Sequence, residues 1–271
     1  MTTLRDVVLH AHSLWPLSGA EDWDAPGLVS GDLDKSVSSI LLAVDAVALT
    51  VDEAIGSGAD LLLTHHPLLL RGITTLAEER YKGKLLSSLI RSNVALLAAH
   101  TNADVVTNGV SDVIAQRLGL AQTEPLTAGA AAGTGIGRVG NLPSPIALGD
   151  LARTIAELFP ATAGGIKVSG EYTQQVQRVS LCGGAGDSLL TAPAVLSSDV
   201  YITSDLRHHP AQEFREQALL NDGPALIDVA HWAAEWLWLE VAAEQLRAAF
   251  PAVEVRVSEL RTDPWDFVVV Q

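Results

Sequence analysis

The sequence predicts an α/β protein built from two similar, interlocked α/β domains that arose by internal duplication. Short apolar runs that indicate buried strands alternate with amphipathic helical segments, which is typical of βαβ units and a mainly parallel sheet. A His-His-Pro sequence occurs once in each half of the chain. Aromatic residues make up only 5% of a chain that is 48% hydrophobic, so aliphatic side chains must fill the core, as in layered helices and strands.

The first half is expected to alternate strands and helices up to about residue 120. Buried strands are predicted at 38–44, 61–63 and 94–99. Helices are predicted at 4–15, 49–57, 84–92 and 110–118. The glycine at position 58 follows the second helix and is a typical helix terminator.

The second half repeats this alternation after a stretch rich in Ala, Gly and Pro at 121–150. Strands are predicted at 176–181, 199–203, 225–227 and 253–257, and helices at 148–158 and 231–250. We place the domains at 1–125 and 126–271, with the C-terminal residues able to return to the first half.

The internal repeat rests on spacing as well as on motifs. Ile40 and Thr64 are 24 residues apart, and Ser180 and Thr203 are 23 apart. Each half also contains a histidine with an acid four residues later, His100-x-x-x-Asp104 and His231-x-x-x-Glu235. The alternative is that all βαβ units look alike, but the paired motifs favour duplication.

Composition and charge exclude several classes of protein. The formal net charge is −15 without a cluster of Lys and Arg, which disfavours nucleic acid binding. No apolar run approaches the roughly 20 residues that span a bilayer, and the N-terminus does not resemble a signal peptide. Cys182 is the single cysteine, so no internal disulfide can form. We expect a cytoplasmic protein without a membrane partner.

Histidines gather where predicted strands end. His65 and His66 lie just past the strand at 61–63, and His100 follows the strand at 94–99. In open parallel sheets, ligands bind beyond the carboxyl ends of the strands. Adjacent residues usually diverge, so His65 and His66 are expected to address two ions lying side by side. A surface loop with two incidental histidines is the competing interpretation.

Two histidine–acid pairs add carboxylates to this edge. His231 and Glu235 share one face at the start of a helix, among three tryptophans, where a carboxylate needs a partner such as a metal ion. An ordinary helix-surface pair is the alternative. Asp104 supplies the second carboxylate, although it could instead cap a helix.

The predicted ligands are imidazoles and carboxylates, which suit Zn, Mn, Fe, Co or Ni better than Ca or Mg. Two divalent ions offset by Asp104 and Glu235 would leave a positive centre in an acidic protein. Such a centre would attract a phosphate or carboxylate and activate a water, and paired ions about 3.5–4 Å apart are a known arrangement for hydrolysis.

Four ordered motifs resemble the Ngg-interacting-factor-three-like family, whose members are often named type 2 GTP cyclohydrolase I homologues. The motifs are Thr64-His-His-Pro67, His100-Thr-Asn-Ala-Asp104, Asp205…His208-His209 and Asp228-Val-Ala-His231…Glu235. The resemblance covers essentially the whole chain. It implies two similar α/β domains with a dinuclear metal centre in the cleft between them, and a homo-oligomer that is commonly a hexamer.

Carried over residue by residue, the resemblance implies the metal ligands His65, His66, Asp104, His231 and Glu235. His100 and His208 would lie beside the ligands, orienting them or acting as acid or base. Two glycine-rich stretches are substrate-binding candidates, through Arg138 and Gly184. The more ordinary interpretations are a strand-entry turn at Arg138 and a tight strand-to-helix turn around Gly184.

Two functions remain open. The first is a metal-dependent hydrolase of a nucleotide or another small anionic heterocycle, and GTP ring opening is the activity that the family name implies. The second is a non-catalytic metal-binding protein, a metal chaperone or a protein-interaction factor that works as an oligomer.

Overall fold

The computed structural model describes residues 1–270, which form two compact units of mixed α/β structure, and this confirms the α/β part of the predicted fold class. Unit 1 comprises Met1–Ala103 and Leu239–Thr262; unit 2 comprises Asp104–Trp238 and the residues from Asp263 onward. The domain boundary predicted at residue 125 therefore lies inside unit 2. The stretch that belongs with the first part of the chain is Leu239–Thr262.

Unit 1 is built on a five-stranded sheet with the strand order β1-β4-β3-β2-β13. Strands β13, β2, β3 and β4 are parallel, and β1 pairs antiparallel with β4. The strands are β1 (Gly27–Ser30), β2 (Ser39–Ala43), β3 (Leu61–Thr64), β4 (Ala95–Ala98) and β13 (Glu254–Val257). Because β2, β3 and β4 are buried along their whole length, the sheet is covered on both faces.

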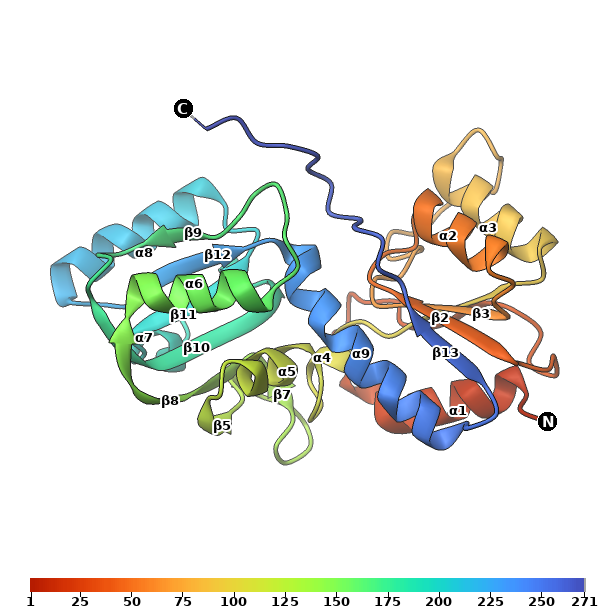
Figure 1. The fold of residues 1–271 in the computed structure, drawn as a ribbon, viewed down its shortest axis with the longest axis horizontal. Helices are drawn as coiled ribbons and strands as arrows, with labels where there is room; N and C mark the ends of the chain where they lie inside the picture. The colour runs from red at the N-terminus through yellow and green to blue at the C-terminus, as the bar shows by residue number, and fades with distance from the viewer. Residues whose placement is uncertain (271) are drawn as a thin grey trace. The chain divides into compact units, whose positions relative to one another are not determined.

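Helices cover both faces of this sheet. α2 (Ala48–Gly56) and α3 (Tyr81–Arg91) pack on one face, and α1 (Leu4–Leu14) and the end of α9 (His231–Ala249) lie on the other (Figure 1). Thr3 and Asp6 form a capping box at the start of α1. The short elements η1 (Leu17–Gly19) and α4 (Thr101–Asp104) follow α1 and β4.

Unit 2 contains a six-stranded mixed sheet with the order β5-β8-β10-β11-β12-β9. Only β10, β11 and β12 are parallel; β5, β8 and β9 join by antiparallel pairing. The strands are β5 (Ala121–Glu124), β8 (Arg138–Ala147), β9 (Lys167–Ser169), β10 (Gln175–Ala185), β11 (Val200–Ser204) and β12 (Ala225–Val229), with a separate pair β6 (Thr127–Ala128) and β7 (Gly135–Ile136).

The helices of unit 2 pack around this sheet. Val195 and Phe214 join a core cluster with Tyr201 and Leu226, which places α7 and α8 against β11 and β12. The helices are α5 (Val110–Arg117), α6 (Leu148–Leu158), η2 (Asp187–Leu189), α7 (Pro193–Leu196), α8 (His208–Asn221) and the start of α9. Within residues 1–270, no helix combines the length and apolar composition needed to cross a membrane.

The predicted strands and helices are largely present, but the edge strands β1 and β9 were not predicted. The stretch at 121–150, rich in prolines and glycines, was expected to contain the crossing between the domains, yet it also contains β8, which pairs with both β5 and β10. Helix α8 was not expected, because its sequence is polar and Phe214 is the residue it buries. The turn expected at 182–186 is largely the end of β10, where the pairing with β11 is irregular.

Candidate metal centre

Three imidazoles of unit 1 converge at the carboxyl ends of β3 and β4. His65 and His66 directly follow β3, and His100 lies two residues after β4. One ring nitrogen of each lies within 4.8 Å of the others, so the three could hold a metal ion. The rings of His65 and His66 lie close together, with their centroids 5.1 Å apart. That these neighbours address two ions lying side by side stays a prediction.

Each of these imidazoles is oriented through its Nδ1 atom. The acceptors are the carbonyl oxygen of Ala99 for His65 at 2.9 Å, Asp45 for His66 at 2.7 Å and Asp24 for His100 at 2.7 Å. Carbonyl and carboxylate oxygens only accept hydrogen bonds, so Nδ1 carries the proton in each ring. In the neutral imidazole, Nε2 then carries the lone pair and is the nitrogen that can bind a metal.

Asp45 is itself held from the far end of the chain. The hydroxyl of Thr262 donates to Asp45 Oδ2, while Oδ1 accepts the hydrogen bond from His66. Thr262 follows β13, the strand that pairs with β2 in the same sheet. Thr262 thus fixes the carboxylate that orients His66.

Asp24 is a fully buried carboxylate at His100. Burial raises its pKa, but hydrogen bonds from the His100 ring and from Thr101 outweigh burial and bring the pKa down to about 2. Thr101 donates to Asp24 through both its backbone N–H and its hydroxyl. Asp24 is therefore a fixed negative charge at neutral pH, and it holds the proton on Nδ1 of His100.

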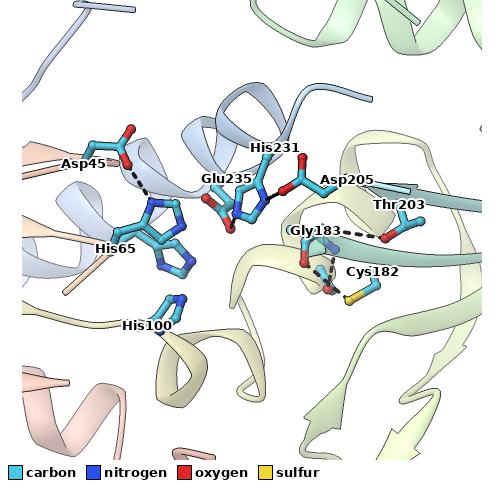
Figure 2. Close-up of polar contacts among 12 residues, drawn as sticks. Asp45, His65, His100, Cys182, Gly183, Thr203, Asp205, His231 and Glu235 are labelled. Carbon is cyan, nitrogen blue, oxygen red and sulfur yellow. Dashed lines mark hydrogen bonds and ion pairs between the residues drawn. The ribbon is translucent and has the colours of Figure 1, made fainter. Parts of the chain in front are cut away.

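Unit 2 contributes a second cluster at the start of α9. His231 Nδ1 lies 2.8 Å from Asp205 Oδ2, and its Nε2 lies 2.8 Å from Glu235 Oε1 (Figure 2). Burial lowers the pKa of His231, but the two carboxylates outweigh burial and raise the pKa well above its ordinary value. Asp205 follows β11 with a left-handed backbone (φ 56°), a conformation that costs energy and is often found at functional sites.

Gly184 lies against this pair. Its φ is +74°, and a Cβ atom at this position would come within 2.9 Å of Glu235 Oε1 and 3.5 Å of His231 Nε2. The hydroxyl of Thr203 donates to the Gly184 carbonyl at 3.1 Å. The glycine thus permits the backbone of β10 to approach the carboxylate, and it is next to the predicted ligands.

Asp104, at the end of α4, is a further carboxylate of unit 2, and it acts on the Cys182 thiol together with Glu235. The buried Cys182 thiol has its pKa raised to about 12, first by burial and then by the negative charges of Asp104 and Glu235. Both carboxylates are therefore near Cys182. Unit 2 supplies one imidazole and two carboxylates of the predicted ligand set.

Arg138 is 2% exposed and bound entirely within unit 2. Its guanidinium donates to Asp112 at 3.0 Å and to the carbonyl oxygens of Gly135, Gly137 and Val106. These bonds use all three nitrogens and fix the loops around β7. A substrate contact by Arg138 stays a prediction and is not needed for the function proposed below.

His208 lies in the first turn of α8 and is exposed, with its ring 5.3 Å from that of His209. Its predicted role beside the metal ligands stays a prediction. Asp45 was not predicted as a partner of His66, nor Asp24 as a partner of His100, and Asp205 was part of a motif without an assigned role. Asp205 comes directly after β11 and Asp45 two residues after β2, so the strand-end argument used for the histidines would have found both.

Comparison with known proteins identifies the family of the chain. A family model described as Duf34/NIF3 (NGG1p interacting factor 3) matches residues 2–264. The chain belongs to the NIF3 family. A NIF3 relative from Streptomyces coelicolor named GTP cyclohydrolase 1 type 2 homolog is 45% identical, over 98% of this chain and 94% of the relative. A relative of the same name from Mycobacterium tuberculosis is 33% identical over 97% and 96%.

Solved structures share the NIF3 fold. A protein of Staphylococcus aureus superposes with a TM-score of 0.86 at 25% identity, over 98% of this chain and 99% of its own. A Bacillus cereus protein described as related to NIF3 has the same TM-score at 23% identity and the same coverage.

Proposed function

We propose that this NIF3 protein binds two divalent metal ions through His65, His66, Asp104, His231 and Glu235 and hydrolyses a nucleotide or another anionic heterocycle. One observation carries the proposal. Each predicted imidazole ligand is held at Nδ1 by a carboxylate or carbonyl oxygen, the arrangement by which metal-binding histidines are oriented and their Nε2 atoms prepared for a metal.

The donor set fits a transition metal. Three imidazoles and two carboxylates favour Zn, Mn, Fe, Co or Ni over Mg or Ca, and a single buried cysteine offers no thiolate cluster. When bound, such ions supply positive charge that attracts an anionic substrate and polarises the bond to be broken. The relatives named GTP cyclohydrolase 1 type 2 homologs motivate a nucleotide as the first substrate to test.

His100 is the proposed acid or base, with His208 as the second candidate. Asp24 keeps the proton of His100 on Nδ1, so its Nε2 is the atom that accepts a proton.

The internal duplication, which we also propose, is supported by a matched pair of aspartates. Asp60 precedes β3 and accepts hydrogen bonds from the backbone N–H groups of Ser38 and Ser39 at the start of β2. Asp199 precedes β11 and accepts from the backbone of Gln177 and Arg178 in β10. Both acids tie the start of one parallel strand to the next, so β2, β3 and β4 correspond to β10, β11 and β12.

A homo-oligomer, a hexamer by family resemblance, is proposed as the working form, in the cytoplasm. Exposed apolar side chains at the C-terminal end support an oligomer: Trp265 is 68%, Phe267 80% and Val270 88% exposed. Single exposed apolar residues are ordinary, but a run of them indicates a surface that another chain covers.

The test combines metal analysis with turnover. Protein purified without chelators is analysed for metal and then incubated with GTP, other nucleotides and phosphoesters. His231→Ala and Glu235→Gln should lose bound metal and at least 100-fold of any turnover. His209→Ala, an exposed histidine outside the ligand set, is the matched control and should keep both.

Three results would count against the proposal. Turnover that survives both ligand substitutions places the chemistry elsewhere. Tight metal binding without turnover of any substrate would instead favour the metal chaperone or interaction factor. If wild-type protein purified without chelators contains no metal, the proposed metal centre itself is contradicted.

A further inference from the structure

A cavity of about 380 Å³ opens beside His66 within unit 1. Its lining includes Pro67, Leu68, Arg71, Tyr81 and Lys82, from the loop after β3 and the first turn of α3. This volume is in the range of small-molecule sites, which commonly combine apolar walls with a few polar groups. Because His66 is a predicted metal ligand, a molecule in this cavity would reach the metal centre.

The cavity carries positive charge in a strongly acidic protein. Lys82 Nζ donates to the carbonyl oxygen of Arg71 at 3.3 Å and lies 5.9 Å from the Tyr81 ring centroid. Among residues 1–270, neither cation forms a salt bridge with a carboxylate. The acid in the lining, Asp45, already accepts from His66 and Thr262.

Arg71 and Lys82 together are suited to binding a phosphate group. A guanidinium presents paired N–H donors that match the oxygens of a phosphate, and an ammonium adds a compact charge. Two adjacent positive charges also match the double charge of a phosphate monoester better than the single charge of a carboxylate. The apolar wall formed by Pro67 and Leu68 can contact the rest of the molecule.

We propose that this cavity binds a phosphate group of the substrate through Arg71 and Lys82. The assignment rests on the proposed function, since it places the phosphate next to His66 and leaves the remainder of the substrate to reach the metal ions. Neither cation is needed for folding, because Arg71 is exposed and Lys82 is partly exposed.

The experiment measures binding without turnover. Metal is removed with a chelator, the chelator is dialysed away, and inorganic phosphate or acetate is titrated by calorimetry at low ionic strength. Wild type should bind phosphate and prefer it to acetate. Arg71→Gln and Lys82→Gln should each weaken phosphate binding about 10-fold, as expected for loss of one charge-assisted hydrogen bond.

Matched controls are Lys84→Gln, an exposed lysine on α3 outside the cavity lining, and Arg117→Gln, an exposed arginine in unit 2. Both should bind phosphate like wild type. Circular dichroism should show the same fold for all four variants.

Two outcomes overturn the inference: no phosphate binding by wild type, or equal binding by wild type and both cavity variants. Equal affinity for acetate and phosphate would overturn the choice of phosphate. If wild type binds phosphate but turns over no substrate, the proposed hydrolysis is contradicted, while the phosphate site in the cavity is supported. If the protein turns over a substrate but does not bind phosphate, the phosphate site in the cavity is contradicted, while the proposed hydrolysis is supported.

Discussion

Asp45 accepts a hydrogen bond from Nδ1 of His66 over 2.7 Å, and the same carboxylate is held by Thr262, 217 residues later in the chain. Neither residue would touch a metal bound at Nε2, yet together they fix the tautomer and direction of the imidazole. Partners of this kind commonly change metal affinity by 10–100-fold when they are removed.

We therefore expect Asp45→Asn to weaken metal binding at His66 by at least 10-fold, because the amide keeps the shape but loses the charge. Titration of metal-free protein with Zn²⁺ or Mn²⁺ measures the change. Asp52→Asn, at an exposed position of the neighbouring helix α2, is the control and should bind like wild type. Equal affinities for both variants would show that Asp45 does not support the ligand.

Gly184→Ala should disturb the Glu235 carboxylate more than the fold. The new Cβ would lie 2.9 Å from Glu235 Oε1, and the residue must keep φ near +74°. Gly133→Ala is a matched control, since Gly133 has φ +77° and open space around it. Both variants should lose about 1–2 kcal/mol of stability through the backbone. Only Gly184→Ala should also lose metal affinity, measured by the same titration.

The thiol of Cys182 should be inert in the folded protein. Burial, together with Asp104 and Glu235, raises its pKa to about 12, so thiolate is scarce at pH 8. A chromogenic disulfide reagent should react with the native chain at least 100-fold more slowly than with the chain in urea. Rapid reaction of the native protein would contradict the buried position.

Whether a strand or helix could be predicted depended on how strongly its own sequence signals that structure. Strands such as β3 and helices such as α9 were predicted because apolar runs and helical periodicity are local signals. Strand β8 was missed because Pro143 and Pro145 normally interrupt strands; here they are exposed, and the pairing of β8 with β10 shifts register around them. Helix α8 was missed because its sequence is largely polar.

The histidine ligands were within reach of sequence reasoning because they lie shortly after predicted strands. Their orienting partners were harder to find, since a hydrogen bond between residues as distant as Asp24 and His100 depends on tertiary structure. The irregular end of β10 that brings Gly184 to Glu235 also depends on pairing with β11, which composition does not reveal.

Asp60 should make stability depend on pH. Burial raises its pKa, but hydrogen bonds from Ser38 and the charge of Lys35 outweigh burial and lower the pKa overall. A carboxyl whose pKa is lower in the folded state stabilises the fold above its unfolded pKa of about 4, and this contribution disappears as the pH falls through the folded pKa. Asp60→Asn should therefore be less stable than wild type at pH 7.

The difference between Asp60→Asn and wild type should shrink as the pH falls below about 4. Urea unfolding at several pH values, followed by circular dichroism, measures it. Asp52→Asn again serves as the control and should show no such trend. A difference that is constant with pH would mean that the carboxylate charge contributes nothing.

A chain ending at Pro264 should assemble less than the full chain, because it lacks the exposed Trp265, Phe267 and the valines that follow. It keeps Thr262 and therefore the contact with Asp45. Light scattering after size exclusion gives the mass of each form. Identical masses would show that this segment does not hold the oligomer together.

The pairing of β13 with β2 sets an order of events during synthesis. A ribosome has made all three imidazoles of unit 1 once it passes His100, but the fifth strand of their sheet and the Thr262 hydroxyl come more than 150 residues later. The growing chain therefore carries His66 through most of translation without the Thr262 hydroxyl that holds its partner Asp45. We expect a metal, bound as proposed, to be acquired by the finished protein.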